Sequence, residues 1–199
     1  METNNQFFIL SKIIKERRTR KAQLMNGKKI EDATIESLLE LADCAPTHGR
    51  TEPWRFQVYA DKGLEAFCEN HAKLYWEGTD EAIRNTTKRD LFGSLYQFAS
   101  HLIVVSMERT EGVKIPDFEE YAACCAAVQN ILLGAEALGL AAIWNSGGMT
   151  YSDKMKEYLG IKEEDQVVAL VYLGYLDTEL DKEAKRRISL DEKTQWIKE

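Results

Sequence analysis

The sequence predicts a layered α/β domain in which helices flank a central mixed β-sheet. Apolar runs of strand length alternate along the chain with amphipathic segments of helix length. With 199 residues the chain is long enough for one substantial core, and its 44% hydrophobic and 30% charged residues are typical of a soluble globular protein. We therefore expect a single domain over residues 1–199, built in two or three layers.

Two amphipathic helices are expected before residue 45. The first covers residues 5–16 and has apolar side chains at helical spacing, namely Phe7, Leu10, Ile13 and Ile14. The second begins near Asp32 or Thr34 and ends at Cys44, because Pro46 cannot continue a helix. Its apolar stripe is Ile35, Leu38, Leu39 and Ala42.

The middle of the chain is less regular. Residues 56–59 alternate as in a half-buried strand, residues 61–63 are expected to form a turn, and residues 64–76 a helix. Residues 77–90 are polar and weakly patterned, which favours either a mobile lid or a frayed helix.

The second half of the chain contains three apolar runs of strand length separated by helical segments. The expected strands are residues 102–105, 141–144 and 167–173, and the expected helices are residues 118–138 and a short one that stops at Gly160. Thr150 and Asp153 have the spacing of a capping box that would open the short helix. The tail from residue 177 onward is charged, and its Trp196 and Ile197 favour packing against another surface.

Charge and cysteine content argue against several function classes. A formal net charge of -7 disfavours general binding to nucleic acid or to acidic membranes. No apolar run approaches the ~20 residues of a membrane-spanning helix, and no secretory signal is visible. The four cysteines lack zinc-ligand spacing, so we expect reduced thiols and a cytoplasmic protein.

The candidate site is built around the stretch that joins the second helix to the first strand. This stretch, the Pro-Trp loop, is residues 45–56 and reads APTHGRTEPWRF. Its prolines and glycine favour an extended course, which suits the presentation of side chains to a flat ligand. Taken alone, the pattern is equally compatible with a well-packed connection.

Three other stretches accompany the loop. They are the basic segment RRTRK at residues 17–21, the stretch AIWNSGG at residues 142–148, and KRR at residues 185–187. The two basic clusters stand out in an acidic chain, and each indicates either an anion site or a solvated face.

In their order and spacing, these four stretches resemble the flavin-dependent nitroreductase family. Its members combine an Arg-Arg-Ser stretch, an Ala-Pro loop that ends in Gln-Pro-Trp, and a glycine-rich turn. The likeness covers nearly the whole chain and is closest to small NAD(P)H nitroreductases with a histidine in the loop. It implies an α+β, nitroreductase-like homodimer with FMN at the subunit interface and a tail (about residues 177–199) packed on the partner subunit.

The resemblance also implies which residues hold the flavin phosphate. A doubly charged phosphate favours arginine and hydroxyl donors. The matching residues are Arg17, Arg18 (through its backbone) and Thr19, and Arg187, with Lys185 or Arg186 as helpers, can complete the set. Lys21 falls where the family places a cation that reaches the pyrimidine end of the ring.

A second set of residues is implied for the flavin ring. These residues are His48, Glu52, Trp144, Asn145, Ser146 and Gly147. The first two belong to the loop that one subunit lends to the other subunit's flavin, and the backbone N–H groups of Gly147 and Gly148 reach flavin N5. A second interpretation of His48 is that it is a hydrogen-bonded structural histidine. The same structural role is expected for His71 and His101.

The implied activity is hydride transfer from NADH or NADPH, through flavin N5, to an electron-poor acceptor such as a nitroaromatic, quinone or enone. The alternatives are other flavin chemistry (dehalogenation or flavin destruction), a dimer that has lost its flavin, and phosphate binding without a redox role. Glu52 stands where many members have Gln, and Asn145 where close relatives often have Arg. Both departures indicate a changed flavin potential or affinity.

Overall fold

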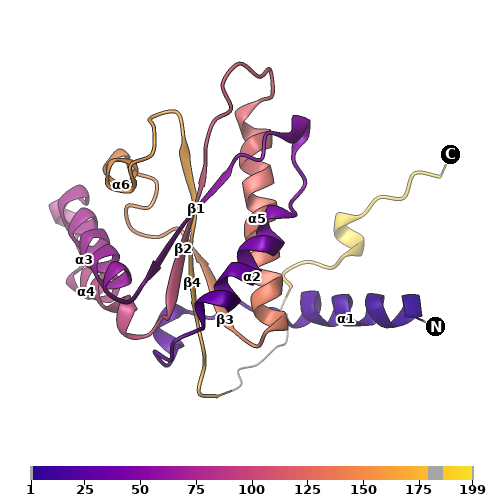
Figure 1. Ribbon diagram of the computed structural model, residues 1–199, viewed down its shortest axis with the longest axis horizontal. Coiled ribbons are helices and arrows are strands. Elements are labelled where there is room, and N and C mark those ends of the chain that lie inside the picture. The colour runs from indigo at the N-terminus through magenta and orange to yellow at the C-terminus, as the bar shows by residue number, and fades with distance from the viewer. Residues whose placement is uncertain (1, 179–185, 199) are drawn as a thin grey trace.

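The computed structural model describes residues 2–178 and 186–198 and places a four-stranded antiparallel sheet at their centre (Figure 1). The strands are β1 (Trp54–Ala60), β2 (His101–Met107), β3 (Ala141–Asn145) and β4 (Gln166–Gly174), in the order β1-β2-β4-β3. Each neighbouring pair is antiparallel, with Phe56 opposite Val105 and Ala142 opposite Leu173.

The α+β class is confirmed, but the sheet of the described residues is antiparallel where a mixed one was expected. The apolar runs of β2 and β4 are buried along almost their whole length. Such runs report burial on both faces of a sheet. They carry no information on strand direction, so the sequence did not exclude the antiparallel arrangement.

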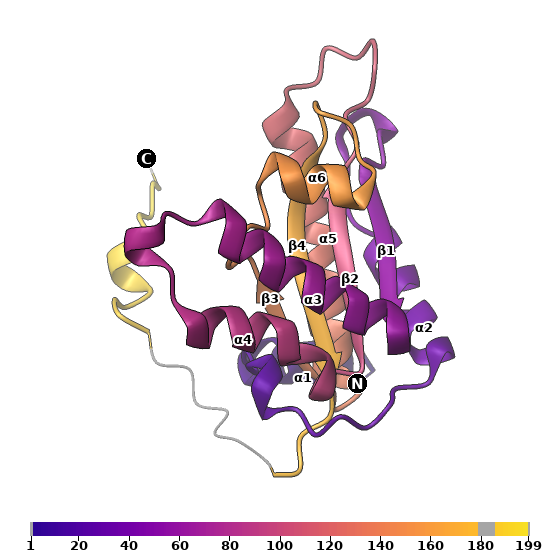
Figure 2. The same cartoon turned by 90° about the vertical axis from the view of Figure 1, so that its left-hand side faces the viewer.

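Helices cover both faces of the sheet, which gives three layers (Figure 1). On one face lie α2 (Asp32–Asp43) and α5 (Asp117–Ala137), which pack on Ile103, Val105 and Val171. On the other face lie α3 (Asp61–Gly78), α4 (Thr86–Ser94) and α6 (Asp153–Leu159), as Figure 2 shows. Leu102 and Val104 point toward this second face, because successive side chains of a strand alternate between faces.

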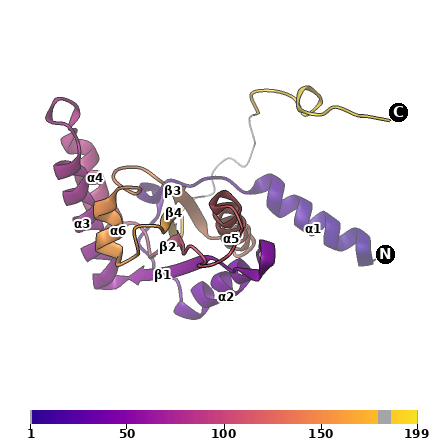
Figure 3. The same cartoon turned by 90° about the horizontal axis from the view of Figure 1, so that it is seen from above.

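The two ends of the chain leave this body (Figures 1 and 3). Helix α1 (Glu2–Glu16) and residues 186–198 both extend away from the sheet on the side of α5. The helix predicted at residues 5–16 is present, but its apolar side chains, Phe7, Phe8, Ile9, Leu10 and Ile14, are exposed. An amphipathic pattern indicates that a face is buried without saying by which surface.

Two predictions of local structure were wrong. Residues 61–63 begin helix α3 instead of forming a turn. The short helix α6 is capped by Ser152, whose Oγ accepts the Met155 N–H at 3.2 Å, and Thr150 is not its cap. The Ser152 hydroxyl, which lies two residues nearer the helix, takes the capping role that was expected of Thr150.

The weakly patterned residues 77–90 contain the end of α3, a short 3-10 turn at Glu81–Ile83 and the start of α4. The side chain of Asn85 caps α4 by accepting the Lys88 N–H at 2.9 Å. The expected lid or frayed helix is therefore a helical hairpin, and Asn85 was the sequence signal for it.

Candidate functional site

The basic segment lies against the edge strand β3. The backbone N–H of Arg20 donates to the carbonyl of Ala142 at 2.9 Å, so residues 17–21 run beside the strand. Arg17 and Arg20 are half-buried, whereas Thr19 and Lys21 are exposed. The Arg18 guanidinium turns back to the carbonyls of Lys15 (2.7 Å) and Arg17 (2.6 Å), which agrees with a backbone role for this residue.

The glycine turn, residues 145–148, follows directly where β3 ends. The Gly147 N–H donates to Asn145 Oδ1 at 3.3 Å, and the Gly147 carbonyl accepts from Thr150 Oγ1 at 2.7 Å. Thr150 is fully buried, and Ser146 is exposed at the tip of the turn. Asn145 is thus engaged in shaping the turn.

A small pocket lies between the basic segment and the glycine turn. It is lined by Ala22, Gln23, Leu91, Phe92, Leu95, Ile143, Asn145 and Tyr172. These residues come from the stretch after the basic segment, from α4 and the turn that follows it, and from β3 and β4. A largely apolar pocket with cationic residues beside it suits a ligand that has a flat apolar part and an anionic part.

Trp144 does not join this group. It alternates with Ile143 and Asn145 along β3, so its side chain lies on the α5 face of the sheet, where its Nε1 donates to the Val168 carbonyl at 3.2 Å. Only its backbone lies beside the pocket residues.

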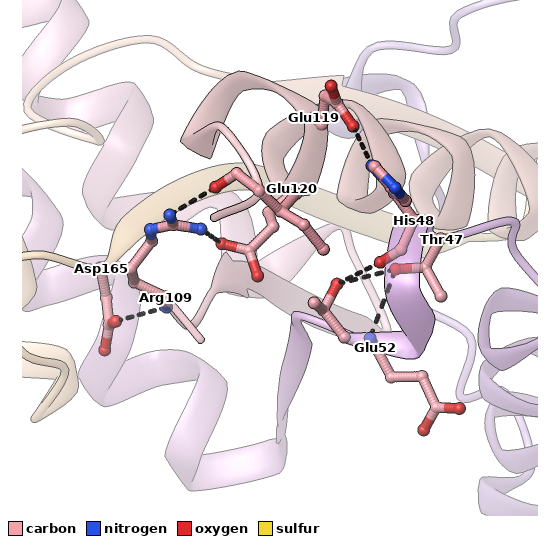
Figure 4. A network of polar contacts seen from close by, with 9 residues as sticks. Thr47, His48, Glu52, Arg109, Glu119, Glu120 and Asp165 are labelled. Carbon is pink, nitrogen blue, oxygen red and sulfur yellow. Dashed lines mark hydrogen bonds and ion pairs between the residues drawn. The ribbon is translucent and has the colours of Figure 1, made fainter. Parts of the chain in front are cut away.

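The Pro-Trp loop is held by contacts with α5 and α2, the first of which Figure 4 shows. His48 Nδ1 lies 2.6 Å from Glu119 Oε2 in the first turn of α5. Trp54, at the end of the loop, is buried, and its Nε1 donates to Asp43 Oδ1 at 2.8 Å. The loop therefore has the contacts of the well-packed connection that was one of its two interpretations.

Glu52 has an unusual backbone conformation in this loop. Its φ is 45° and that of Arg50 is 57°, both in the left-handed region that glycine favours. The Glu52 N–H donates to Thr47 Oγ1 at 3.3 Å, and that hydroxyl lies 2.9 Å from Thr51 Oγ1. The exposed Glu52 carboxylate points away from the other labelled side chains (Figure 4).

The base of α5 is fixed by a buried ion pair next to the loop (Figure 4). The Arg109 guanidinium binds the carboxylate of Glu120, which is almost fully buried, and the Arg109 N–H donates to Asp165 Oδ1 at 2.9 Å. Burial acts to raise the pKa of Glu120, but hydrogen bonds from Thr110 and Arg109 outweigh it and lower the pKa. Glu120 is therefore an anion that anchors the helix turn carrying Glu119.

The two groups of predicted site residues are far apart within one chain. β1 and β3 form opposite edges of the sheet, separated by three inter-strand spacings, or about 14 Å. The two groups also lie at different heights along the strands. Trp54 pairs with Met107, which pairs with Gln166 of β4, whereas Ala142 pairs with Leu173 of β4. Gln166 and Leu173 are separated by about 24 Å along that strand. His48 and Glu52 therefore do not share a pocket with residues 17–21.

The third predicted cluster is only partly visible. Lys185 lies outside the described residues, and Arg186 and Arg187 are exposed at the start of the extending tail. Their place in the site stays a prediction.

His71 was expected to be a hydrogen-bonded structural histidine. Neither ring nitrogen makes a hydrogen bond of good geometry within the described residues, but the Gly147 backbone lies close enough to act on the ring as an acceptor and to oppose the lowering of its pKa. His71 lies on α3 directly beneath Gly148, and its ring stacks on Phe92 of the pocket with centroids 4.6 Å apart. A lone histidine on a helix gives no sequence signal for such a place.

Two further features concern membranes and metals. Within residues 2–178 and 186–198, no helix combines the length and apolarity needed to cross a bilayer. Across the same described residues, histidine, cysteine and acidic side chains form no group of three that is suited to a metal ion.

Comparison with known proteins agrees with this architecture. A curated protein of Archaeoglobus fulgidus, named "Putative NADH dehydrogenase/NAD(P)H nitroreductase", is 32% identical, and the match covers 81% of this chain and 83% of that protein. The crystal structure of a nitroreductase-like family protein from Bacillus cereus is 28% identical with a TM-score of 0.81, covering 96% of each chain. The fold is shared with a nitroreductase of Bacteroides fragilis solved with bound FMN (24% identity, TM-score 0.69, covering 91% of this chain and 97% of that one).

The model of the nitroreductase family matches residues 14–175, which run from the end of α1 to the end of β4 and include both groups of candidate residues. The chain belongs to the nitroreductase family.

Proposed function

We propose that the protein is an FMN-dependent oxidoreductase that passes a hydride from NAD(P)H to an electron-poor acceptor such as a nitroaromatic, a quinone or an enone. The observation that carries the proposal is the hydrogen bond from Arg20 to Ala142, because it holds the basic segment beside the strand that leads into the glycine turn. Membership of the nitroreductase family supports the same reaction class.

The residues at the β3 edge fit the cofactor chemically. Arg17 and the Thr19 hydroxyl offer charge-assisted donors to a phosphate, and Lys21 offers a cation to the polar end of the ring. The small pocket beside them has an apolar lining against which one edge of a flat ring can pack. Gly148 brings bare backbone to the pocket wall, where a side chain would collide with Phe92.

A second copy of the chain is part of the proposal. Helix α1 exposes Phe7, Phe8 and Leu10, and a groove between α1, α2 and α5 is lined largely by apolar side chains such as Leu41 and Leu133. Apolar surface of this kind is stabilised when another subunit covers it. In the homodimer, α1 and the tail with Trp196 and Ile197 would lie across the partner.

The homodimer also gives the Pro-Trp loop a role. His48 and Glu52 are too far from the basic segment of their own chain to share its ligand. Both are exposed, so each can approach the flavin of the partner subunit. This arrangement makes every site from the β3 edge of one chain and the loop of the other.

FMN supplies the hydride-accepting chemistry when it is bound, so the chain needs no catalytic acid or base. The chain's own task is to grip the phosphate, to orient the ring and to leave one face open for nicotinamide and acceptor in turn. A Glu52 carboxylate near the ring would oppose its reduction. The four cysteines are free thiols, which fits the reducing cytoplasm where NAD(P)H is available.

The experiment is a flavin and turnover assay on the purified protein. We expect a yellow protein that retains FMN, is bleached by NADH or NADPH under anaerobic conditions, and regains its colour with a nitroaromatic or a quinone. Colour recovery only with a halogenated aromatic would assign other flavin chemistry. A colourless protein that cannot be reconstituted with FMN would refute the proposal.

A further inference from the structure

The side chain of His71 is buried without satisfying its hydrogen-bonding groups. It is fully buried on α3, between the face of Phe92 and the edge of Phe67 at 5.9 Å. Neither ring nitrogen makes a hydrogen bond of good geometry within the described residues, and the nearest acceptor is the backbone of Gly147. A buried polar group without a partner costs stability, so a function is expected to retain it.

The glycine turn is pressed onto this imidazole. Gly148 has φ +69°, and a Cβ at this position would lie 2.6 Å from His71 Nε2 and 3.0 Å from the Phe92 ring. Only glycine fits both the backbone conformation and the space. The turn and the histidine are therefore in direct contact, and the Gly147 backbone acts on the ring as a hydrogen-bond acceptor.

The peptide between Gly147 and Gly148 has a defined orientation. Its carbonyl accepts from the fully buried Thr150 at 2.7 Å and so points into the protein, on the side of His71. The peptide bond is planar and trans, so the Gly148 N–H points the opposite way, toward the exposed side of the turn. The Gly147 N–H is already used by Asn145, so of the two glycine N–H groups it is that of Gly148 which the turn presents outward.

We propose that His71 and Thr150 are positioning residues, which hold the Gly147 carbonyl inward so that the Gly148 N–H is presented to the edge of the bound flavin. This inference rests on the proposed function. It assigns one of the two glycine N–H groups to the flavin contact, and it gives the buried imidazole and the buried hydroxyl a common task.

The protonation state of His71 suits this task. Burial lowers the pKa of His71 to about 4, against a smaller opposing effect of the Gly147 backbone. At neutral pH the ring is uncharged and keeps one N–H donor for the carbonyl above it.

The oxidation state of the flavin decides what the Gly148 N–H contributes. N5 of the oxidised ring accepts a hydrogen bond, whereas N5 of the reduced ring carries a hydrogen. An outward N–H therefore stabilises the oxidised form more than the reduced form. If the turn is no longer held, the protein loses affinity mainly for oxidised FMN.

The test compares His71→Phe, which keeps the aromatic stacking, and Thr150→Val, which keeps the side-chain shape. The two readouts are the Kd of oxidised FMN, from flavin fluorescence, and the midpoint potential of the bound flavin. We expect each variant to bind oxidised FMN about tenfold more weakly and to raise the midpoint potential by about 30 mV, the value of a tenfold change for a two-electron couple.

Two controls separate positioning from general damage. Ser152→Ala removes a hydroxyl that donates to the Met149 carbonyl at 2.8 Å in the same loop, and it should leave both readouts unchanged. His71→Gln restores a side-chain N–H donor and should recover most of the affinity and the potential. Thermal unfolding of each apo protein reports whether a variant has folded.

Each outcome has a clear consequence. Folded His71→Phe and Thr150→Val proteins with wild-type Kd and potential would overturn the inference while leaving the proposed function intact. If His71→Phe does not fold, Thr150→Val alone decides. A wild-type protein that binds no FMN would overturn the proposed function, and the inference with it.

Discussion

The basic segment of residues 17–21 and the Pro-Trp loop lie at opposite edges of one sheet, and they differ in what holds them. The basic segment is tied to β3 by a backbone hydrogen bond and adjoins a pocket of its own chain. The loop is tied to α5 through His48 and Glu119, and the Glu52 carboxylate points into open space. The basic segment lies beside a pocket of its own chain, whereas the loop presents exposed polar groups such as the Glu52 carboxylate.

The difference suggests that each chain carries two unlike halves of a site. Opposite sheet edges, about 14 Å apart across the strands, cannot converge on one small ligand without unfolding the sheet. Two copies can bring unlike edges together, because a two-fold axis places the loop of one chain against the β3 edge of the other. The following predictions test the two halves separately.

The largest effect is expected from breaking the contact between copies. Phe7→Glu with Ile14→Glu places charges on the exposed apolar face of α1. We expect a monomer by light scattering and a loss of FMN affinity of about 100-fold or more, since buried aromatic anchors dominate interfaces. Ile83→Glu, at an equally exposed apolar residue on the α3–α4 hairpin, is the control and should change neither. A monomer that binds FMN normally would contradict the two-chain site.

The next prediction concerns the β3 half alone and is a pH dependence of the unfolding free energy caused by His71. Its folded pKa of about 4 lies below the ordinary value of 6.5, so the unfolded chain binds a proton more readily between these values. The stabilising effect of the neutral ring is fully present above pH 6.5 and is lost as pH falls toward 4. The loss reaches about 3 kcal/mol.

Urea unfolding of the apo protein at several pH values measures this loss. His71→Phe removes the titrating group and should flatten the difference between pH 6.5 and pH 4. Equal pH slopes for the two proteins would show that the imidazole is charged or exposed in solution.

A smaller effect is expected at the phosphate end of the β3 half. Arg17→Ala removes a charge-assisted donor, which is worth about 2 kcal/mol, or roughly 30-fold in FMN affinity. Lys28→Ala, at an exposed lysine outside the basic segment, serves as the control for net charge. Isothermal titration with FMN distinguishes the two, and unchanged affinity in Arg17→Ala would remove this residue from the phosphate site.

The smallest effect is expected in the loop half. The His48–Glu119 contact is solvent-exposed, so Glu119→Gln should change the unfolding free energy by less than about 1 kcal/mol. Glu119→Ala, which also removes the acceptor oxygen that Gln would keep, frees the loop, and a faster FMN release from the intact dimer is the expected consequence. A stopped-flow dissociation rate equal to that of the wild type would mean that the loop does not reach the flavin.

The sequence predicted some elements of the fold and missed others. Helical and strand periodicity located β1, α2, β2, α5, β3 and β4 to within a few residues, because burial on a sheet or helix face imposes that spacing. Strand direction and the helical hairpin at residues 77–90 were missed, since the first depends on tertiary pairing and the second on the local cap Asn85. The start of α3 was also missed, and no side-chain cap marks it in the sequence.

For the site, residue types identified the candidates but not their neighbours. Arg17 and Asn145 were predicted on one ligand, and the structure brings their stretches to one edge of the sheet. The sequence could not show that Trp144 faces away, because its side depends on the register of β3. Thr150 has the spacing of a helix cap, and only the fold reveals that it holds the glycine turn.

Mixing two defective chains tests the two-chain site most directly. One chain carries Arg17→Ala, and the other carries His48→Ala with Glu52→Ala. Each alone should bind FMN weakly. After unfolding and refolding together, every mixed dimer has one site with both halves intact, so we predict that tight FMN binding and NAD(P)H-dependent bleaching return. Mixed dimers that bind no better than either parent would contradict a site made from two chains.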